Sequence, residues 1–252
     1  MRRTLILIAT FVLALQAYSQ TEEEAMSMVN DSLKANPNNV NWLYVKGLIL
    51  SQSKKFEQAI PYLTLSLKNL HQFKIENPNA LAFPNELPLD SCDILRERAY
   101  CYDLLDSVNN SVNDYRYVQM REPNDLFYST AVSRLYIKHK IFDKAQIEID
   151  RLKDRKGNNE RGLVQQAILF YEQQEYNKAQ AAVAIALKKY PASIEGLMTQ
   201  GKILVKLNRQ TESCKYFSEA KSKMTLAYFG GQRGYQRDFE KDIESLKKLY
   251  CK

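Results

Sequence analysis

Residues 160–193 read ERGLVQQAILFYEQQEYNKAQAAVAIALKKYPAS, and this stretch contains two apolar stripes at helical spacing. The first stripe advances in steps of one, three and four residues through Leu163, Ala167, Phe170 and Tyr171. The second follows a polar break and consists of Tyr176, Ala179, Val183, Ala186 and Leu187. Pro191 ends the second helix, and small residues on each stripe allow the two backbones to approach closely. The stretch therefore predicts a hairpin of two helices.

The small position of each helix recurs along the chain. In the first helices it is occupied by Gly47, Ala99, Ser133, Ala167 and Gly201, whose numbers differ in turn by 52, 34, 34 and 34. In the second helices it is occupied by Ala25, Ala59, Ser111, Ala145, Ala179 and Ser213, whose numbers differ in turn by 34, 52, 34, 34 and 34. The spacing of 52 is one period of 34 plus an insert of 18, and both series place it in the same gap. Because two independent series agree across an insertion, a helical bundle with alanines aligned by chance is a poor explanation.

Two further positions repeat less completely. An aromatic residue near the turn recurs as Phe56, Phe142 and Tyr176, and a proline after the second helix recurs as Pro37, Pro123 and Pro191. The whole pattern resembles the tetratricopeptide repeat, a helix-turn-helix unit of about 34 residues. This resemblance implies an all-α fold, a right-handed α-solenoid of helix-turn-helix repeats. We expect a half-repeat at 21–36, repeats at about 40–71, 92–125, 126–159, 160–193 and 194–227, an insert at 72–91 and a capping helix at 235–250.

The capping helix and the insert have distinct patterns. One face of the capping helix carries Phe239, Ile243, Leu246 and Leu249, and its other face is charged. The insert contains Pro78, Pro84 and Pro88, which exclude a continuous helix. It is also too apolar for a free linker, so we expect it to fold against the repeats, as a strap over an apolar edge, or to meet a partner.

Residues 1–19 have the pattern of a secretory signal peptide. Arg2 and Arg3 precede an apolar run from Leu5 to Leu15, and small residues follow. The run is short for a membrane span, so a cleaved signal is favoured over an uncleaved anchor. We expect an exported protein of the periplasm or cell envelope, or a secreted one, whose mature chain, residues 20–252, is one repeat domain without a membrane span.

Positive charge is concentrated at the C-terminal end. The chain has a formal net charge of +7, and residues 201–252 contain twelve Lys or Arg against six Asp or Glu. One alternative function is therefore peripheral attachment to an anionic surface, lipid or nucleic acid, through Lys215, Lys221, Lys223, Arg233, Arg237, Lys241, Lys247 and Lys248. These bases are interleaved with acidic residues, which makes a nucleic-acid partner a poor expectation.

Four cysteines would meet an oxidising compartment if the chain is exported. Cys214 lies near the start of the last repeat's second helix, and Cys251 lies at the end of the terminal helix. Because those ends are neighbours in an antiparallel stack, we expect a disulfide between Cys214 and Cys251. Cys92 and Cys101 would pair only if Cys92 precedes its helix and folds back. Four reduced thiols are the alternative for both pairs.

No arrangement typical of catalysis is found. Neither His71 nor His139 has the spacing of a metal-binding motif, and no glycine-rich phosphate loop occurs. We expect no enzymatic activity, no cofactor and no metal site.

The resemblance implies that the first helices line a concave groove that binds an extended peptide or a helix of another protein. The positions that would face this groove are Tyr44, Leu48, Arg96, Tyr100, Phe127, Arg134, Lys138, Arg161, Ile168, Tyr171, Met198 and Lys202. Aromatic residues alternate with bases, which suits an apolar segment with acidic groups or a C-terminal carboxylate. Each position has an equal alternative role in helix packing or solvation. The expected function is a non-catalytic protein-interaction scaffold or adaptor of the bacterial cell envelope, without a small-molecule substrate.

Overall fold

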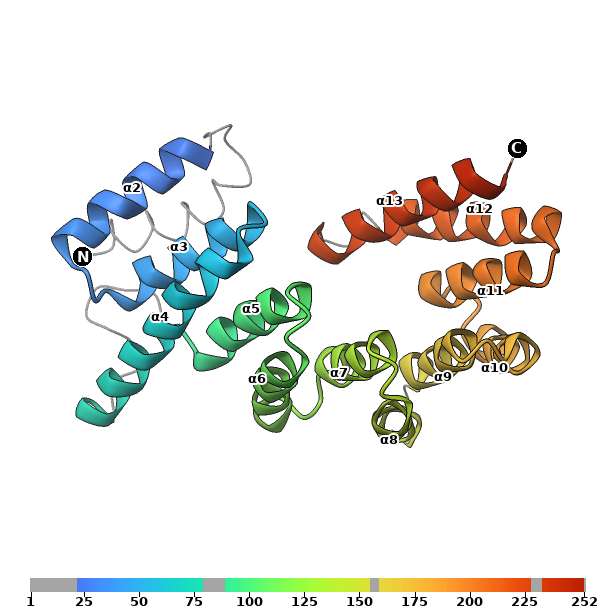
Figure 1. Cartoon of the computed structure of the whole chain (residues 1–252), viewed down its shortest axis with the longest axis horizontal. Coiled ribbons are helices and arrows are strands. Elements are labelled where there is room, and N and C mark those ends of the chain that lie inside the picture. Colours follow the sequence, from blue (N-terminus) through green and yellow to red (C-terminus); the bar gives the residue numbers. More distant parts are fainter. Residues whose placement is uncertain (1–21, 79–88, 155–158, 228–232, 252) are drawn as a thin grey trace. The chain divides into compact units, whose positions relative to one another are not determined.

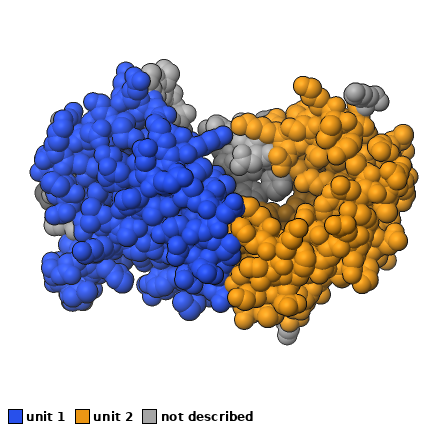
Figure 2. Space-filling view, in the orientation of Figure 1, with its two compact units in different colours: residues 1–124 blue, residues 125–252 orange. Residues whose placement is uncertain are grey.

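The computed structural model describes residues 22–78, 89–154, 159–227 and 233–251, with the backbone alone for 225–227 and 233–239. Within these ranges it contains twelve helices and no strand. The chain divides into two compact units, residues 1–124 and 125–252, shown in different colours in Figure 2. The predicted signal peptide, and residues 79–88 of the predicted insert, lie outside the described residues.

Helical hairpins build both units (Figure 1). Unit 1 contains α2 (Glu22–Ala35), α3 (Val40–Gln52), α4 (Phe56–Glu76), α5 (Ser91–Leu104) and α6 (Val108–Arg121). Unit 2 contains α7 (Leu126–Lys138), α8 (Phe142–Lys153), α9 (Glu160–Glu172), α10 (Tyr176–Lys189), α11 (Ile194–Lys206), α12 (Gln210–Ala227) and α13 (Arg233–Tyr250). In unit 1, α3 packs on α4 and α5 on α6; in unit 2, α7 packs on α8, α9 on α10 and α11 on α12. Each hairpin also contacts the next within its unit.

The small residues of both series lie at the close contacts inside the hairpins. Those with a side chain are at most 1% exposed, namely Ala25, Ala59, Ala99, Ser111, Ser133, Ala145, Ala167, Ala179 and Ser213. A Cβ atom at Gly47 would lie 2.6 Å from Leu63, and one at Gly201 would lie 2.4 Å from Phe217. The repeating small residues therefore exist because the paired helices leave no room for larger ones.

The turns inside the hairpins share a backbone conformation that the sequence pattern did not predict. The residue after each first helix's C-cap has a positive φ, at Lys54, Asp106, Lys140, Gln174 and Asn208. The next residue's N–H then donates to a carbonyl five residues earlier, for example from Glu175 to Phe170 at 2.9 Å. This is the Schellman closure of a helix end, which usually places glycine at the left-handed position. Here the position follows the same period as the small residues, without a single glycine.

Four of the first helices, α3, α5, α7 and α11, begin at side-chain caps, whereas α9 does not. Asn39 Oδ1 accepts from the backbone N–H of Trp42 at 2.9 Å, and Asp125 Oδ1 accepts from that of Phe127 at 2.8 Å. Ser193 Oγ accepts from the N–H of Gly196 at 3.2 Å. These contacts satisfy backbone donors that a helix start leaves without partners, and they set where α3, α7 and α11 begin.

The ends of the predicted insert are helical, which differs from the expected range. Helix α4 continues to Glu76, and α5 already begins at Ser91. Helix α4 stops at Glu76 because the next residue, Asn77, precedes Pro78. A proline disfavours the helical conformation of the residue before it. At the other end, Asp90 and Asp93 form a capping box that starts α5.

The terminal helix packs against the last hairpin of unit 2. In Figure 1, α13 lies beside α12, and Ile243, 1% exposed, joins a cluster with Leu197, Met198 and Met224. The expected apolar face is wrong at Leu249, which is 64% exposed. The side chain of Phe239 lies outside the described residues.

A disulfide joins Cys214 to Cys251, with Cα atoms 5.6 Å apart. These are the two cysteines that the sequence analysis paired, whereas Cys92 and Cys101 are free and buried. A bridge that closes a loop of this length typically contributes about 2 to 4 kcal/mol to stability.

Within the described residues, none of the helices has the length and apolar character that crossing a bilayer requires.

Candidate functional site

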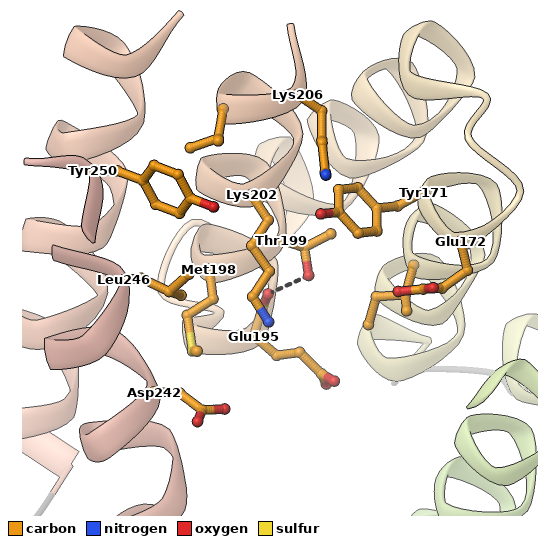
Figure 3. A pocket seen from close by; sticks show the side chains of 12 residues that line it. Tyr171, Glu172, Glu195, Met198, Thr199, Lys202, Lys206, Asp242, Leu246 and Tyr250 are labelled. Carbon is orange, nitrogen blue, oxygen red and sulfur yellow. Dashed lines mark hydrogen bonds between the residues drawn. The ribbon is translucent and has the colours of Figure 1, made fainter. Parts of the chain in front are cut away.

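A pocket of about 320 Å³ opens between three helices of unit 2 (Figure 3). Helix α9 contributes Ile168 and Tyr171, α11 contributes Met198 and Lys202, and α13 supplies the facing side. These four residues of α9 and α11 are all among the positions expected to face a partner. The pocket therefore brings together one third of the expected positions, from two consecutive first helices.

The floor of the pocket is apolar and rigidly packed. Met198 is only 3% exposed and belongs to the same core cluster as Ile243. Leu246 of α13 packs on this cluster and also lines the pocket. Because these side chains are held by the core, the floor presents a preformed apolar surface, to which a ligand's apolar group binds without ordering the protein first.

Two lysines of α11, Lys202 and Lys206, lie one helical turn apart and also line the pocket. In the part of the chain that the structure describes, the side chains of Lys202 and Lys206 make no ion pair and no hydrogen bond. The lining also contains the carboxylates of Glu172, Glu195 and Asp242. The pocket thus carries charges of both signs, with two ammonium groups still available for a ligand.

The negative charge of one of these carboxylates, Glu195, is compensated by other side chains of the protein. Glu195 Oε1 accepts from Arg134 Nη2 at 2.5 Å and from Gln165 Nε2 at 3.1 Å. Gln165 is fully buried, and Ser133 donates to its side-chain oxygen at 3.4 Å. The network holds Glu195 to α7 and α9, so its charge is compensated inside the wall rather than offered to the pocket.

Two tyrosines face each other across the pocket. The hydroxyl groups of Tyr171 and Tyr250 point toward one another in Figure 3. Burial, with a smaller contribution from the neighbouring Glu172 carboxylate, raises the pKa of Tyr171 to about 12. The Tyr171 ring also packs edge-on against Tyr176, with centroids 5.7 Å apart. At neutral pH this phenol is therefore a protonated, positioned hydrogen-bond donor.

The other expected positions of unit 2 lie outside the pocket lining. Arg134 is engaged with Glu195, and the ring of Phe127 packs against Tyr128, with centroids 5.3 Å apart. Lys138 also has an interaction partner, and Arg161 is half-buried. A carboxylate from α11 thus already compensates the charge of Arg134.

Three of the four expected positions of unit 1, Tyr44, Arg96 and Tyr100, have local contacts of their own. Arg96 donates to Asp93 at 2.7 Å and forms an ion pair with Glu122, so its charge is also compensated. Tyr100 packs edge-on against Phe56, with centroids 6.1 Å apart. Burial raises the pKa of Tyr44. Leu48 is half-buried.

A second pocket, of about 420 Å³, lies in unit 1 between α4, α5 and α6. It contains none of the expected positions. Its lining includes His71, which lies on the surface of α4. Within the described residues, no group of three or more His, Cys, Asp or Glu side chains is placed to hold a metal ion.

Sequence reasoning missed the contribution of α13 and part of α11. Asp242, Leu246 and Tyr250 complete the pocket, although the helix was expected only as a cap. Lys206 could have been predicted from the sequence, because it lies two full periods after Lys138, one of the expected positions. Tyr250 carried no such signal, since the terminal helix has no earlier copy to compare with.

The alternative site at the C-terminal end has few described features. Lys221 is ion-paired with Glu244, and the side chains of Arg233 and Arg237 lie outside the described residues. The ion pair reduces the positive charge available at this end.

No protein-family model matches the sequence, and no curated protein matches it. Solved structures do resemble it. A tetratricopeptide repeat protein from Parabacteroides merdae superposes with a TM-score of 0.61 at 14% identity, covering 98% of each chain. A thermophilic tetratricopeptide repeat protein from Thermus thermophilus superposes with a TM-score of 0.51 at 15% identity, covering 82% of this chain and 98% of that one.

At such low identities the similarity concerns the fold. Together with the buried small residues that recur at a constant period, it shows that this chain is an all-α helical-repeat protein with the tetratricopeptide-repeat solenoid fold.

Proposed function

We propose that the protein is a non-catalytic scaffold that holds a partner protein at the pocket formed by α9, α11 and α13. The observation that carries this proposal is the pair of lysines, Lys202 and Lys206, without protein partners among the described residues and beside a packed apolar floor. A wall of helices with preformed pockets suits the capture of an extended peptide or a helix.

The chemistry of the lining defines the segment that fits. Ile168, Met198 and Leu246 accept an apolar side chain, and an acidic group next to it would pair with the two ammonium groups. The hydroxyl of Tyr171 adds a donor for a carbonyl or carboxylate oxygen. Because Glu172 and Asp242 repel a second acidic group, a segment with one carboxylate beside one apolar residue fits better than a polyacidic one.

We further propose that the protein works in an oxidising compartment, the periplasm or cell envelope. The disulfide between Cys214 and Cys251 supports this, since such bonds persist mainly outside the cytosol. The signal-like residues 1–19 point to the same place. Detection of the bridge in protein isolated from the native envelope, by mass spectrometry without reduction, tests it; free thiols at both positions would contradict it.

A selection experiment tests the binding proposal with a defined probe. Random peptides displayed on phage are selected on the oxidised protein, and the recovered peptides are measured by fluorescence anisotropy. The charge-reversed variant Lys202→Glu/Lys206→Glu should bind them at least about tenfold more weakly, because two attractive ion pairs become repulsive.

The matched control is Lys188→Glu/Lys215→Glu, which makes the same change of charge at exposed lysines outside the pocket. It should bind within about twofold of the original protein. Recovery of no binding peptide, or equal loss in both variants, would overturn the proposal.

A further inference from the structure

The disulfide lies directly beside the pocket. Cys251 follows Tyr250, the last residue of α13, and Tyr250 lines the pocket opposite Tyr171. The partner cysteine, Cys214, lies in the second turn of α12, and its sulfur approaches the backbone oxygen of Tyr250 to 3.6 Å. The bridge therefore fixes the residue next to a pocket-forming side chain.

Little else anchors the last turn of α13. The fully buried anchor of the described part of this helix is Ile243, seven residues before Tyr250. Leu246, Lys247 and Tyr250 are half-buried, whereas Lys248 is exposed and Leu249 is 64% exposed. Terminal helical turns with few buried contacts open at little cost in free energy. Packing therefore holds the last turn only in part, and the bridge is its covalent anchor.

We infer that the Cys214–Cys251 disulfide controls binding at the pocket, with reduction releasing Tyr250 and weakening the partner's attachment. This inference rests on the proposed function, since it concerns the same pocket. With the bridge formed, the last turn of α13 holds the ring over the apolar floor. Without it, the turn frays, one side of the pocket is lost, and a bound apolar group becomes exposed to water.

The chemistry is thiol–disulfide exchange with a dithiol as the reductant. A thiolate of the dithiol attacks one sulfur of the bridge and forms a mixed disulfide, while the other cysteine leaves as a thiolate that takes up a proton. The second thiolate of the reductant then attacks the mixed disulfide. The second protein cysteine leaves as a thiolate that takes up a proton, and the reductant becomes an intramolecular disulfide. Two electrons and two protons thus pass from the dithiol to the protein.

The remaining cysteines do not interfere with this exchange. Both bridge cysteines are partly exposed, whereas Cys92 and Cys101 are buried. Burial also raises the pKa of Cys101 to about 11, so its reactive thiolate form is scarce at neutral pH.

The test uses a peptide selected on the oxidised protein as the probe. Its dissociation constant is measured by anisotropy before and after reduction with dithiothreitol, and we expect about tenfold weaker binding in the reduced protein. The Cys214→Ser/Cys251→Ser variant should bind as weakly as reduced protein, with no response to the reductant. Tyr250→Ala should also bind weakly in both the oxidised and the reduced state, although its disulfide can still form. Leu249→Ala, in the same turn but exposed, should bind like the original protein and keep the response.

Hydrogen exchange of the backbone amides of residues 247–251 provides a readout without any ligand. We expect these amides to exchange at least about tenfold faster after reduction, while helix content by circular dichroism stays unchanged. Equal affinity or equal exchange in the two redox states would overturn this inference and leave the proposed function standing. Loss of helix throughout unit 2 would overturn it as well. Failure of the oxidised protein to bind any peptide would overturn the proposed function, and with it the inference.

Discussion

Arg98 and Asp114 form a two-point ion pair across the α5–α6 hairpin of unit 1. Arg98 Nε donates to Asp114 Oδ2 at 2.8 Å, and Nη2 donates to Oδ1 at 2.8 Å. The two side chains are only 15% and 10% exposed, and Arg98 Nη1 also donates to Thr64 at 3.1 Å. The pair ties α5 to both α4 and α6 at the second pocket, so it fixes the packing of this part of unit 1.

Removing one member of this pair should be costly. Asp114→Ala leaves the Arg98 charge in a poorly hydrated site without its partner, and we expect a loss of about 3 kcal/mol in the free energy of unfolding. Urea denaturation measures it. Asp31→Ala, which removes the exposed partner of Lys34, should leave stability nearly unchanged, because water screens an exposed pair. Similar losses in the two variants would show that burial does not set the cost.

Substitution of the small residue at a hairpin contact should destabilise the fold. In Gly201→Ala the new Cβ would lie 2.4 Å from the Phe217 ring, and we expect a net loss of about 1 to 2 kcal/mol despite alanine's better helix propensity. In Gly196→Ala the new Cβ would lie 3.1 Å from the Leu187 side chain and 3.1 Å from Ser193 Oγ, a less severe approach, so this variant should lose less stability than Gly201→Ala. Thermal unfolding followed by circular dichroism compares them. A more stable Gly201→Ala protein would contradict the close contact.

Glycine at a left-handed turn position should stabilise the chain. Gln174 has a φ of 63°, a conformation that costs about 1 kcal/mol for a residue with a side chain of this kind. We therefore expect Gln174→Gly to raise the melting temperature. Asn208→Gly, at a φ of 58°, should give a smaller gain, because asparagine tolerates this conformation better than glutamine. An equal or larger gain at Asn208 would show that backbone strain is not the cause.

One half-buried carboxyl, that of Glu97, should make stability depend on pH. Burial raises the pKa of Glu97, and a hydrogen bond from Ser51 offsets part of this effect. A raised pKa means that the folded protein holds this proton more tightly than the unfolded chain. Its contribution to stability is therefore full below the unfolded pKa and decreases as pH rises through the folded value.

Glu97→Gln removes that dependence and keeps an acceptor for Ser51. We expect the variant to gain stability relative to the original protein as pH increases from about 4 to about 7, measured by urea denaturation at each pH. The exposed Glu57→Gln, on α4, serves as the control and should show no such trend. A parallel pH profile for Glu97→Gln and the original protein would contradict the assignment.

Much of the fold follows from local sequence. The small residues at a constant period predicted which helix faces meet, and Ala59, Ala145 and Ala179 are fully buried as that pattern requires. Such a pattern is readable because steric exclusion acts at every repeat in the same way. The second helices α4, α8 and α10 begin at Phe56, Phe142 and Tyr176, the residues at which the turn aromatic recurs.

The left-handed turn residues were not readable in the same way. Gln174 and Lys140 adopt the conformation because the hairpin's packing imposes it, and neither residue type prefers it on its own. Similarly, α4 extends past the expected end of its repeat until Pro78 stops it.

The candidate site shows most clearly which features the sequence predicted and which only the tertiary structure decided. The resemblance to the tetratricopeptide repeat implied that Ile168, Tyr171, Met198 and Lys202 face one groove, and Ile168 and Lys202 are one period of 34 residues apart. Only the tertiary structure decides which charges on that face are available. Arg134 is compensated by Glu195, a residue 61 positions away in sequence, and the pocket is completed by Tyr250 from a helix with no earlier copy. Helix periodicity is a local property of the chain, whereas ion pairing depends on distances between side chains that only folding sets.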